Sequence, residues 1–486
     1  MQKKSVAKNY FYNVAYQVLA IILPIITTPY LSRVLGAENI GIYSYTISIS
    51  AYFILFGSLG IALYGQREIA FNEDNPKKYS KIFWEITILK TITMSISLLI
   101  FGLTFCRNGN YHTYYRILIL EIIGNLFDIS WFFQGIEDFK KIVLRNIIIK
   151  LVSVICVFTF VKTSNDLVIY FFIYVFSVLI GNLSLWVNLS KILEKVNIKE
   201  LNILKHVKPT IALFVPQIAV QVYTLLDRTM VGAIIEDKSE VGFYTQGQTI
   251  IKLLLTIETS LGTVMLPRIA NTYAKGDDKT ILEYLSKSFG VVILLAFPLI
   301  FGVIATSEKF VPIFFGAGYG RVATVMNVIS PILFIIGLND AIGMQYLLPT
   351  KKQNQFTKAV ICGAISNFIM NSLLIPKFGA VGAAIGTIIA ESVVAGVEMK
   401  YTWKTFDYIT LFKKSLKYLF FSIIMFIACL LVKNIFANNL ITLIIQVLVG
   451  VAVYGVLLLI NKDELIMEIL DKAKQVIKTK KQSLSK

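Results

Sequence analysis

The sequence predicts an all-α membrane protein with about fourteen transmembrane helices, in which two six-helix lobes, related as parallel repeats, surround a central cavity and two C-terminal helices follow. The first observation behind this prediction is composition: the 486 residues are 56% hydrophobic, with a mean hydropathy of +0.70, and only 16% are charged. Soluble domains are about 25% charged. The second is that the apolar residues form windows of about 20, which cross a bilayer core of ~30 Å as helices. The third is a resemblance between the two halves of the chain.

The apolar windows have an even number, which places both ends of the chain on one side of the membrane. They lie at 10–32, 40–63, 83–105, 113–134, 143–161, 167–189, 210–235, 241–264, 288–307, 322–348, 356–376, 379–399, 415–437 and 440–460. Roughly three quarters of the 47 Lys and Arg fall on the side that holds both termini. The positive-inside rule therefore predicts cytoplasmic termini, and the net charge of +18 is a topology signal that implies no nucleic-acid partner.

The first span combines prolines with a polar face. Pro24 and Pro29 predict a bent helix, because neighbouring helices can satisfy the backbone groups that a proline leaves free. Asn13 and Gln17 lie one helical turn apart and share a face. Arg33, at the outer end, is either a residue of the cavity mouth or a charge that extends to the membrane surface.

The second to fifth spans carry small residues and isolated charges. Glycines at 57, 60 and 65 predict close helix packing. Glu121 and Asp128 share one face of span four, and Lys90 and Lys150 lie in spans three and five. Either acid can pair with a lysine across helices as a structural contact, or serve as an ion-coupling site.

A polar segment at 191–208 separates the two halves and contains five lysines. Its composition predicts a surface helix or a linker on the anionic inner leaflet. We therefore expect an N-lobe at 1–190, an interfacial linker at 191–208, a C-lobe at 209–400, spans thirteen and fourteen at 401–462, and a basic amphipathic cytoplasmic tail at 463–486.

Span seven, Pro209 to Ile235, is the most informative stretch because it carries an acid and a base within an apolar helix. Gln217, Gln221, Thr224 and Arg228 lie on one helical face, and Asp227 adjoins Arg228. A polar stripe in hydrocarbon is costly unless it faces protein or water, which favours a helix that lines a cavity. The alternatives are a structural Asp227–Arg228 pair or an arginine that reaches the membrane surface.

Span eight repeats this pattern with Gln248, Lys252, Thr256 and Thr259 on one face. Two cations that face one chamber repel each other unless an anion lies between them. The two faces together therefore predict a cavity for an anionic ligand.

The later spans predict bends and close contacts. Pro298 and Pro331 are candidate hinge points in spans nine and ten, and Asp340 in span ten is a further candidate for ion coupling. Small residues permit tight contact between spans eleven and twelve. These residues are Gly379, Gly382, Ala383, Ala384 and Gly386.

The sequence carries no pattern for a cofactor, a metal or catalysis. Cys106, Cys156, Cys362 and Cys429 are far apart, and neither His112 nor His206 has neighbouring ligands in sequence. No phosphate-binding loop and no Ser/His/Asp arrangement occurs. We therefore expect a protein that is not an enzyme and needs no cofactor.

Several motifs resemble those of bacterial oligosaccharide-repeat-unit flippases, a family within the multidrug/oligosaccharidyl-lipid/polysaccharide exporter superfamily. They are RVLGAENIGIYSYT, LGIALYGQREIA, PTIALFVPQIAVQVYTLLDRTMVG, VGFYTQGQTIIK, TVMLPRIANTYAKGD and IPKFGAVGAAIGTIIAE, and they cover about residues 5 to 400 in order. The resemblance implies two six-helix lobes and alternating access in the bacterial cytoplasmic membrane. It also implies transfer of undecaprenyl-diphosphate-linked oligosaccharide from the inner to the outer leaflet for surface polysaccharide synthesis, with membrane lipids, a polysaccharide polymerase and glycosyltransferases as partners.

In such a protein, Arg228 and Lys252 are expected to hold the diphosphate, with Asp227 orienting Arg228. Gln217, Gln221, Gln248, Asn13, Gln17, Arg33 and Lys150 complete the expected cavity lining. Three alternatives stay open at this point: a cation-coupled multidrug antiporter of the same superfamily, a membrane glycan polymerase or acyltransferase, and a scaffold without transport activity.

Overall fold

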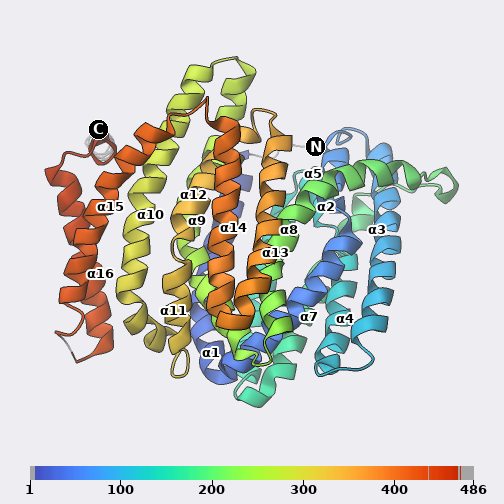
Figure 1. Ribbon diagram of the computed structural model, residues 1–486. Coiled ribbons are helices and arrows are strands. Elements are labelled where there is room, and N and C mark those ends of the chain that lie inside the picture. Colours follow the sequence, from blue (N-terminus) through green and yellow to red (C-terminus); the bar gives the residue numbers. More distant parts are fainter. Residues whose placement is uncertain (1–5, 436, 469–470, 472–486) are drawn as a thin grey trace, which may run out of the picture. The chain divides into compact units, whose positions relative to one another are not determined.

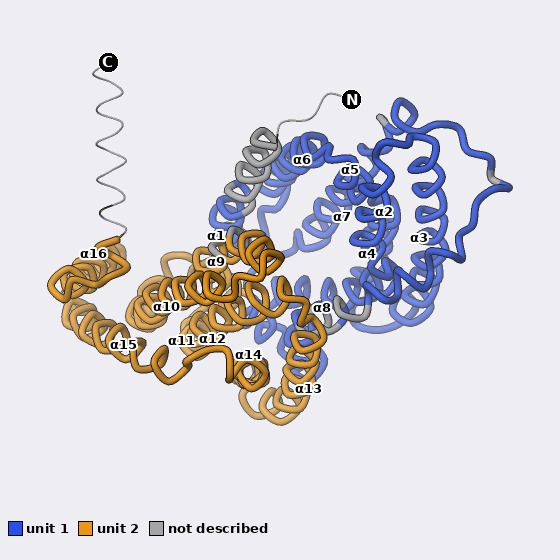
Figure 2. The backbone as a smooth tube through the Cα atoms, turned by 90° about the horizontal axis from the view of Figure 1, so that it is seen from above, with its two compact units in different colours: residues 1–245 blue, residues 246–486 orange. Residues whose placement is uncertain are grey.

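The computed structural model describes residues 6–435, 437–468 and 471, and within them the chain consists of helices joined by loops and turns (Figure 1). Contacts divide it into two compact units, Met1–Thr245 and Gln246–Lys486, which Figure 2 shows in different colours. The prediction of an all-α membrane protein is confirmed. The lobe boundaries expected from the sequence stay a prediction.

Unit 1 is built from seven long or medium helices and one short one, with the first turns of α9 at its end. These are α1 (Val6–Ser58), α2 (Ile61–Ala70), α3 (Pro76–Phe105), α4 (His112–Leu126), α5 (Ser130–Gly135), α6 (Phe139–Phe160), α7 (Leu167–Ser184) and α8 (Val207–Ile234). Short 3-10 turns occur at Ser164–Asp166, Trp186–Lys191, Ile198–Glu200 and Leu204–His206. The helix α8 contacts α1 and α2.

Unit 2 contains the rest of α9 (Ser239–Ala274) and the helices that follow it. These are α10 (Asp278–Phe314), α11 (Gly320–Ile329), α12 (Ile332–Asn339), the π-helical turn η5 (Asp340–Leu347), α13 (Gln353–Phe378), α14 (Ala380–Thr402), α15 (Tyr408–Leu431) and α16 (Asn439–Ile460). Here α15 and α16 pack on α10, and α14 packs on α13, α12 and α11.

Eleven helices of the described chain are long and apolar enough to cross a membrane, or twelve if the bent pair α11 and α12 forms one span. A straight helix of the 53 residues of α1 would be about 80 Å long at 1.5 Å per residue, more than twice the ~30 Å core. However, α1 consists of two helical parts that meet at Gly36, whose φ of 80° is left-handed. If the two parts of α1 are counted separately and the 28-residue α8 is added, the number of spans is compatible with the fourteen that the sequence predicts. The protein is thus a multi-pass membrane protein.

Polar loop residues begin several of these helices. Asn75 accepts a hydrogen bond from the backbone N–H of Lys78 at the start of α3, and Pro76 occupies the first helical position. Asp277 and Asp407 cap α10 and α15 in the same way. Each cap satisfies a backbone donor that the helix itself leaves free, so the short polar loops define where the apolar helices start.

Close approach at glycines confirms two predictions about helix packing in unit 1. Gly65 lies against the ring of Trp131, where an added Cβ would be 2.4 Å from Cε3. Gly60 has a φ of 69° and lies against the backbone of Phe214, where an added Cβ would be 3.1 Å from Cα. An aromatic core forms around Trp131, with Phe83 and Phe132.

Unit 2 confirms the predicted tight contact between spans eleven and twelve. Helices α13 and α14 form a hairpin across Gly379, and a Cβ on Gly382 would lie 2.4 Å from the main-chain oxygen of Leu374. The axes of α11 and of the segment that follows Pro331 differ by 42°, so the predicted bend is present there. Pro298 lies within α10.

The segment 191–208 is a linker rather than a surface helix. It contains only isolated 3-10 turns before α8 begins at Val207. The predicted amphipathic tail lies mostly outside the described residues; its first described turns, at 464–468, place Leu465 against Gly290 of α10.

Candidate functional site: a polar cluster on α8

Asp227, the acid that adjoins the predicted polar face, is buried at the interface of α8 and α9. Asp227 is 2% exposed, and its Oδ2 accepts a hydrogen bond of 2.5 Å from the hydroxyl of Tyr244. Arg228, the next residue, is partly buried. An acid and a base are therefore held within the apolar body of unit 1, an arrangement that is costly and usually functional in a membrane protein.

A hydroxyl network joins the same region of α8 to α1. Thr229 Oγ1 donates to Ser48 Oγ at 2.9 Å and lies 3.4 Å from the hydroxyl of Tyr52. One helical turn further along, Gly232 lies against the ring of Tyr45. This stretch of α8 thus meets hydroxyl and aromatic side chains of α1, and the hydroxyls can hydrogen-bond to those of sugars.

An apolar cavity of about 470 Å³ adjoins this cluster in unit 1. It lies between α1 and α3, and its lining consists of Tyr52, Phe53, Phe56, Gly57, Leu59, Thr93, Ile96, Ser97 and Ile100. The hydroxyls of Thr93 and Ser97 are bonded to main-chain oxygens of α1, at 2.6 Å each, which leaves the wall apolar. Tyr52 belongs to both the cavity and the polar network, so an apolar groove meets a polar cluster at this residue.

The other predicted cavity residues are distributed over both units. Lys252 is exposed and Gln248 is buried on the part of α9 that belongs to unit 2. Gln221 and Arg33 are exposed, and Lys150 is half-buried, in unit 1. The side chains of Asn13, Gln17 and Gln217 lie outside the described part of the structure. That these residues share one chamber stays a prediction.

The predicted pairing of Glu121 or Asp128 with a lysine takes a different form. Glu121 is 3% exposed, and its two carboxylate oxygens accept hydrogen bonds of 2.7 Å from Ser50 and Tyr174. The buried Lys90 donates at 2.7 Å to the main-chain oxygen of Asp128, whose carboxylate accepts from the backbone N–H of Ser130. These contacts join α1, α3, α4 and α7, and a role in ion coupling stays a prediction.

A buried polar cluster around His206, on the linker, was not predicted from the sequence. His206 is 2% exposed; its Nδ1 lies 2.7 Å from the hydroxyl of Tyr64, and its Nε2 lies 2.8 Å from Glu85 Oε2. Lys205 Nζ lies 2.6 Å from the same oxygen, and Glu85 Oε1 accepts from the backbone N–H of Asn202. The cluster fastens the linker to α2 and α3 immediately before α8, and the isolated histidine in the sequence gave no sign of it.

This cluster predicts a pH-dependent stability. Burial lowers the pKa of His206, against the opposing effect of Glu85. When folding lowers the pKa of a histidine, the protein keeps its full stability at pH values above the unfolded pKa of about 6.5. Stability falls as the pH drops below that value, because the unfolded state binds the proton more readily than the folded state. We expect the thermal unfolding temperature of the purified protein to fall between pH about 7 and about 5, and His206→Gln to flatten this dependence. His112→Gln, at the other histidine, is the control and should retain it.

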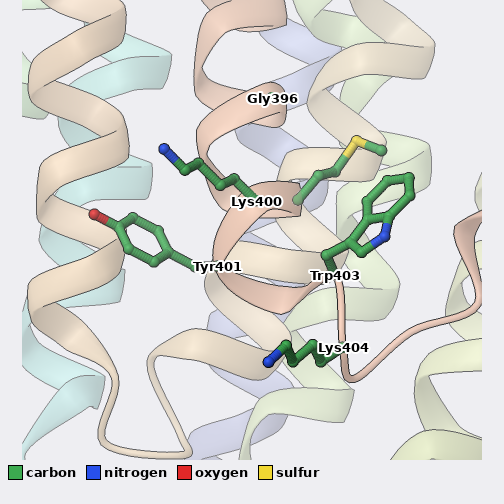
Figure 3. A pocket seen from close by; sticks show the side chains of 6 residues that line it. Gly396, Lys400, Tyr401, Trp403 and Lys404 are labelled. Atoms are coloured by element: carbon green, nitrogen blue, oxygen red, sulfur yellow. The ribbon is translucent and has the colours of Figure 1, made fainter.

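A second cavity, of about 660 Å³, lies at the end of α14. Figure 3 shows Lys400, Tyr401, Trp403 and Lys404 around it, with aromatic and basic side chains side by side. Aromatic and basic residues together are typical of the membrane–water interface, where lysines also meet anionic lipid headgroups. None of the predicted site residues lines this cavity.

The fold and the cluster define a helical membrane protein with buried polar groups, as in transporters. The chain matches the family described as "Polysaccharide biosynthesis protein" over residues 6–273, more than half of its length, and "MatE" over residues 212–374. It therefore belongs to the polysaccharide biosynthesis protein family.

Individual relatives agree with this assignment. The chain is 27% identical over 406 residues to "Putative O-antigen transporter" of Escherichia coli (strain K12), covering 82% of the chain and 97% of the relative. It is 23% identical to "Capsular polysaccharide biosynthesis protein CapF" of Staphylococcus aureus over 82% of the chain and 99% of the relative. Its fold is similar to that of the lipid II flippase MurJ in an inward closed conformation, with a TM-score of 0.70, 18% identity, and coverage of 94% of this chain and 100% of that one.

Proposed function

We propose that the protein is a flippase that moves undecaprenyl-diphosphate-linked oligosaccharide repeat units from the inner to the outer leaflet of the bacterial cytoplasmic membrane. Transport proceeds by alternating access and serves the synthesis of a surface polysaccharide. The protein performs no covalent chemistry on its cargo.

The observation that carries this proposal is the match to an O-antigen transporter over 97% of that protein's length. The family assignment rests on residues 6–273. A relative that matches almost from end to end supports a common activity more strongly than a shared fold does, because one fold hosts several functions.

The geometry of unit 1 suits a cargo that is part lipid and part polar. In our proposal the diphosphate binds Arg228, and Asp227 holds the polar part of α8 through Tyr244. The isoprenoid tail occupies the apolar groove beside Tyr52, which adjoins the polar cluster. The diphosphate is then held by polar groups of the protein and the isoprenoid tail by apolar ones. The anionic headgroup can therefore cross the membrane without entering the hydrocarbon.

Topology completes the proposal. The distribution of Lys and Arg supports cytoplasmic termini, so the linker at 191–208 and its lysines lie on the anionic inner leaflet. Glycosyltransferases supply the cargo on that side, and a polysaccharide polymerase consumes it on the other.

The test is a strain that lacks the gene but retains its glycan synthesis pathway. We expect its lipid extract to contain complete undecaprenyl-diphosphate oligosaccharide, confined to the inner leaflet, and the surface polysaccharide to be lost. Accumulation of incomplete oligosaccharide would point instead to an enzyme.

The match to "MatE" over residues 212–374 favours one second candidate, a cation-coupled multidrug antiporter. It predicts a strain with normal lipid-linked oligosaccharide and an altered tolerance of cationic drugs. The two candidates are thus separated by the same strain.

A further inference from the structure

The cavity of about 660 Å³ at the end of α14 has no part in the proposed cargo site. Most of its lining follows one helical stripe, over the last turns of α14 and the turn after it, with the spacing i, i+3, i+4, i+7 and i+8. These residues are Gly396, Met399, Lys400, Trp403 and Lys404, and Tyr401 adjoins them. The stripe therefore combines apolar and basic side chains on one surface of unit 2.

The length of α14 places this cavity at the boundary between lipid and water. The 23 residues of Ala380–Thr402 extend about 34 Å, slightly more than the ~30 Å hydrocarbon core. Lys400, Trp403 and Lys404 lie at the C-terminal end of that length and are exposed. Lysine and aromatic side chains are favoured at this depth, because an ammonium group reaches the lipid phosphates while apolar atoms stay in the hydrocarbon.

The cavity is formed by a segment that is fixed to the core of unit 2. Trp403 is 55% exposed, but its ring stacks on that of the buried Tyr408 with centroids 5.5 Å apart. The hydroxyls of Thr402 and Tyr408, both buried, lie 2.6 Å apart. Phe406 packs against Phe289 of α10 with ring centroids 5.7 Å apart. The fold itself therefore holds the Trp403 ring at the surface.

The charge of this segment is strongly positive. Residues 400–417 contain five lysines and a single acid, Asp407. The Asp407 carboxylate caps α15, since it accepts hydrogen bonds from the backbone N–H and the hydroxyl of Thr410 at 3.0 and 2.6 Å. Neither Lys400 nor Lys404 forms an ion pair with a residue that the structure describes. Two like charges at this spacing repel each other, so an external anion between them is stabilised.

We propose that this cavity binds an anionic phospholipid of the surrounding membrane. The ammonium groups of Lys400 and Lys404 hold its phosphate, and the beginning of an acyl chain lies beside Trp403 and Met399. Figure 3 supports this division, because Lys400 and Lys404 extend toward the side of the helix on which Tyr401 lies, whereas Trp403 lies on the other side. Lysines alone suit any soluble anion, and the adjoining apolar surface is what favours a lipid.

A phospholipid is favoured over the proposed cargo by the chemistry of the lining. The cavity offers two ammonium groups but a single hydroxyl, that of Tyr401, whereas an oligosaccharide needs many hydrogen-bonding partners. Placing the bound lipid in the inner leaflet rests on the topology of the proposed function. Binding of an anionic phospholipid does not, because it depends only on the residues of the cavity.

The experiment measures quenching of Trp403 fluorescence by brominated lipids in vesicles that contain the purified full chain. The chain has four tryptophans, so the signal of Trp403 is the difference between the wild type and Trp403→Phe. Brominated phosphatidylglycerol and brominated phosphatidylcholine are compared at equal mole fraction. Each lysine contributes about 1 kcal/mol near an anionic surface, which is a factor of about 5. We therefore expect phosphatidylglycerol to be enriched beside Trp403 by up to roughly 30-fold.

Two variants test the two parts of the cavity. A double variant with Lys400→Gln and Lys404→Gln should lose the preference for phosphatidylglycerol. Its matched control, with Lys77→Gln and Lys78→Gln at exposed positions of α3, removes the same charge and should keep the preference.

Gly396→Leu should weaken quenching by brominated phosphatidylglycerol, because it fills the cavity, and a Cβ on Gly396 meets nothing within 4 Å. Gly455→Leu on α16 is its control, because a Cβ there also meets nothing within 4 Å. The two variants change different groups, so either one that folds is sufficient.

Several outcomes would overturn the proposal. Equal quenching by the two brominated lipids excludes a selective site, and so does a preference that survives in the double variant of Lys400 and Lys404. A preference lost equally in the control with Lys77 and Lys78 shows only diffuse attraction to the protein surface. If one equivalent of unbrominated undecaprenyl-diphosphate oligosaccharide abolishes the quenching, the cavity binds cargo, and the phospholipid assignment fails while the flippase proposal stands. Conversely, a protein that shows the expected quenching but moves no lipid-linked oligosaccharide retains the phospholipid site and overturns the flippase proposal.

Discussion

Replacing Arg228 by alanine is expected to lower the export of lipid-linked oligosaccharide by roughly 10- to 100-fold at normal protein levels. A charge-assisted contact to an anion contributes about 1.5–3 kcal/mol, which corresponds to this range. The effect should exceed that of Lys252→Ala, because Lys252 is exposed and Arg228 is partly buried, where a charge is screened less. Export is measured as surface polysaccharide per cell, with protein quantity determined in the membrane fraction.

Two further variants separate charge from geometry. Arg228→Lys keeps the charge but loses the planar fork that binds a diphosphate through two parallel hydrogen bonds, so we expect an intermediate rate. Lys279→Ala removes an exposed basic residue at the start of α10 and should export normally. If Arg228→Ala is present at wild-type level and exports at the wild-type rate, the assignment of the diphosphate to Arg228 is wrong.

The second large effect is expected at a pair of glycines in unit 1. A Cβ on Gly41 of α1 would lie 1.7 Å from the main-chain oxygen of Lys238, and a Cβ on Gly242 of α9 would lie 2.2 Å from that of Ala37. Gly41 and Gly242 are the first residues of two segments that resemble each other, GIYSYTISI and GFYTQGQTI. Each glycine lies against the main-chain oxygen of the residue that precedes the other glycine by four positions.

Gly41→Ala must therefore displace backbone, since a main-chain oxygen cannot move away as a flexible side chain can. We expect a loss of roughly 1–3 kcal/mol in the conformation described here, as for overpacking elsewhere, and a lower thermal unfolding temperature. Gly102→Ala on α3 is the matched control, because a Cβ there meets nothing within 4 Å. In a helix, that change should be neutral or stabilising. Equal unfolding temperatures for the two variants would show that the Gly41 contact is absent in the membrane.

Helix positions and packing were predictable from the sequence because both follow from local composition. Windows of about 20 apolar residues correspond to helices, and the small residues at Gly65 and Gly382 mark real close contacts. Pro331 lies at a real bend for a similarly local reason, the loss of a backbone donor. The polar face of α8 was also visible, since the helical period places Arg228 beside Gln221 and Thr224.

Side-chain partners were not predictable, because they come from helices far apart in the chain. The sequence places Asp227 beside Arg228, but its described partner is Tyr244, from the next helix. His206 finds Glu85 across 121 positions, and Lys90 meets a main-chain oxygen rather than an acid. Glu398 could be singled out from the sequence because it is an acid within a predicted span. Only the structure shows that its carboxylate has no hydrogen-bond donor among the described residues.

The most direct measurement is translocation by the purified full chain in vesicles that contain labelled undecaprenyl-diphosphate oligosaccharide. A reagent that modifies sugars and does not cross the membrane reports which leaflet holds each headgroup. We predict that the protein makes nearly all of the labelled lipid accessible over time, without change in its covalent structure, and that Arg228→Ala slows this transfer. Accessibility equal to that of protein-free vesicles, or conversion of the oligosaccharide to another product, would contradict a flippase.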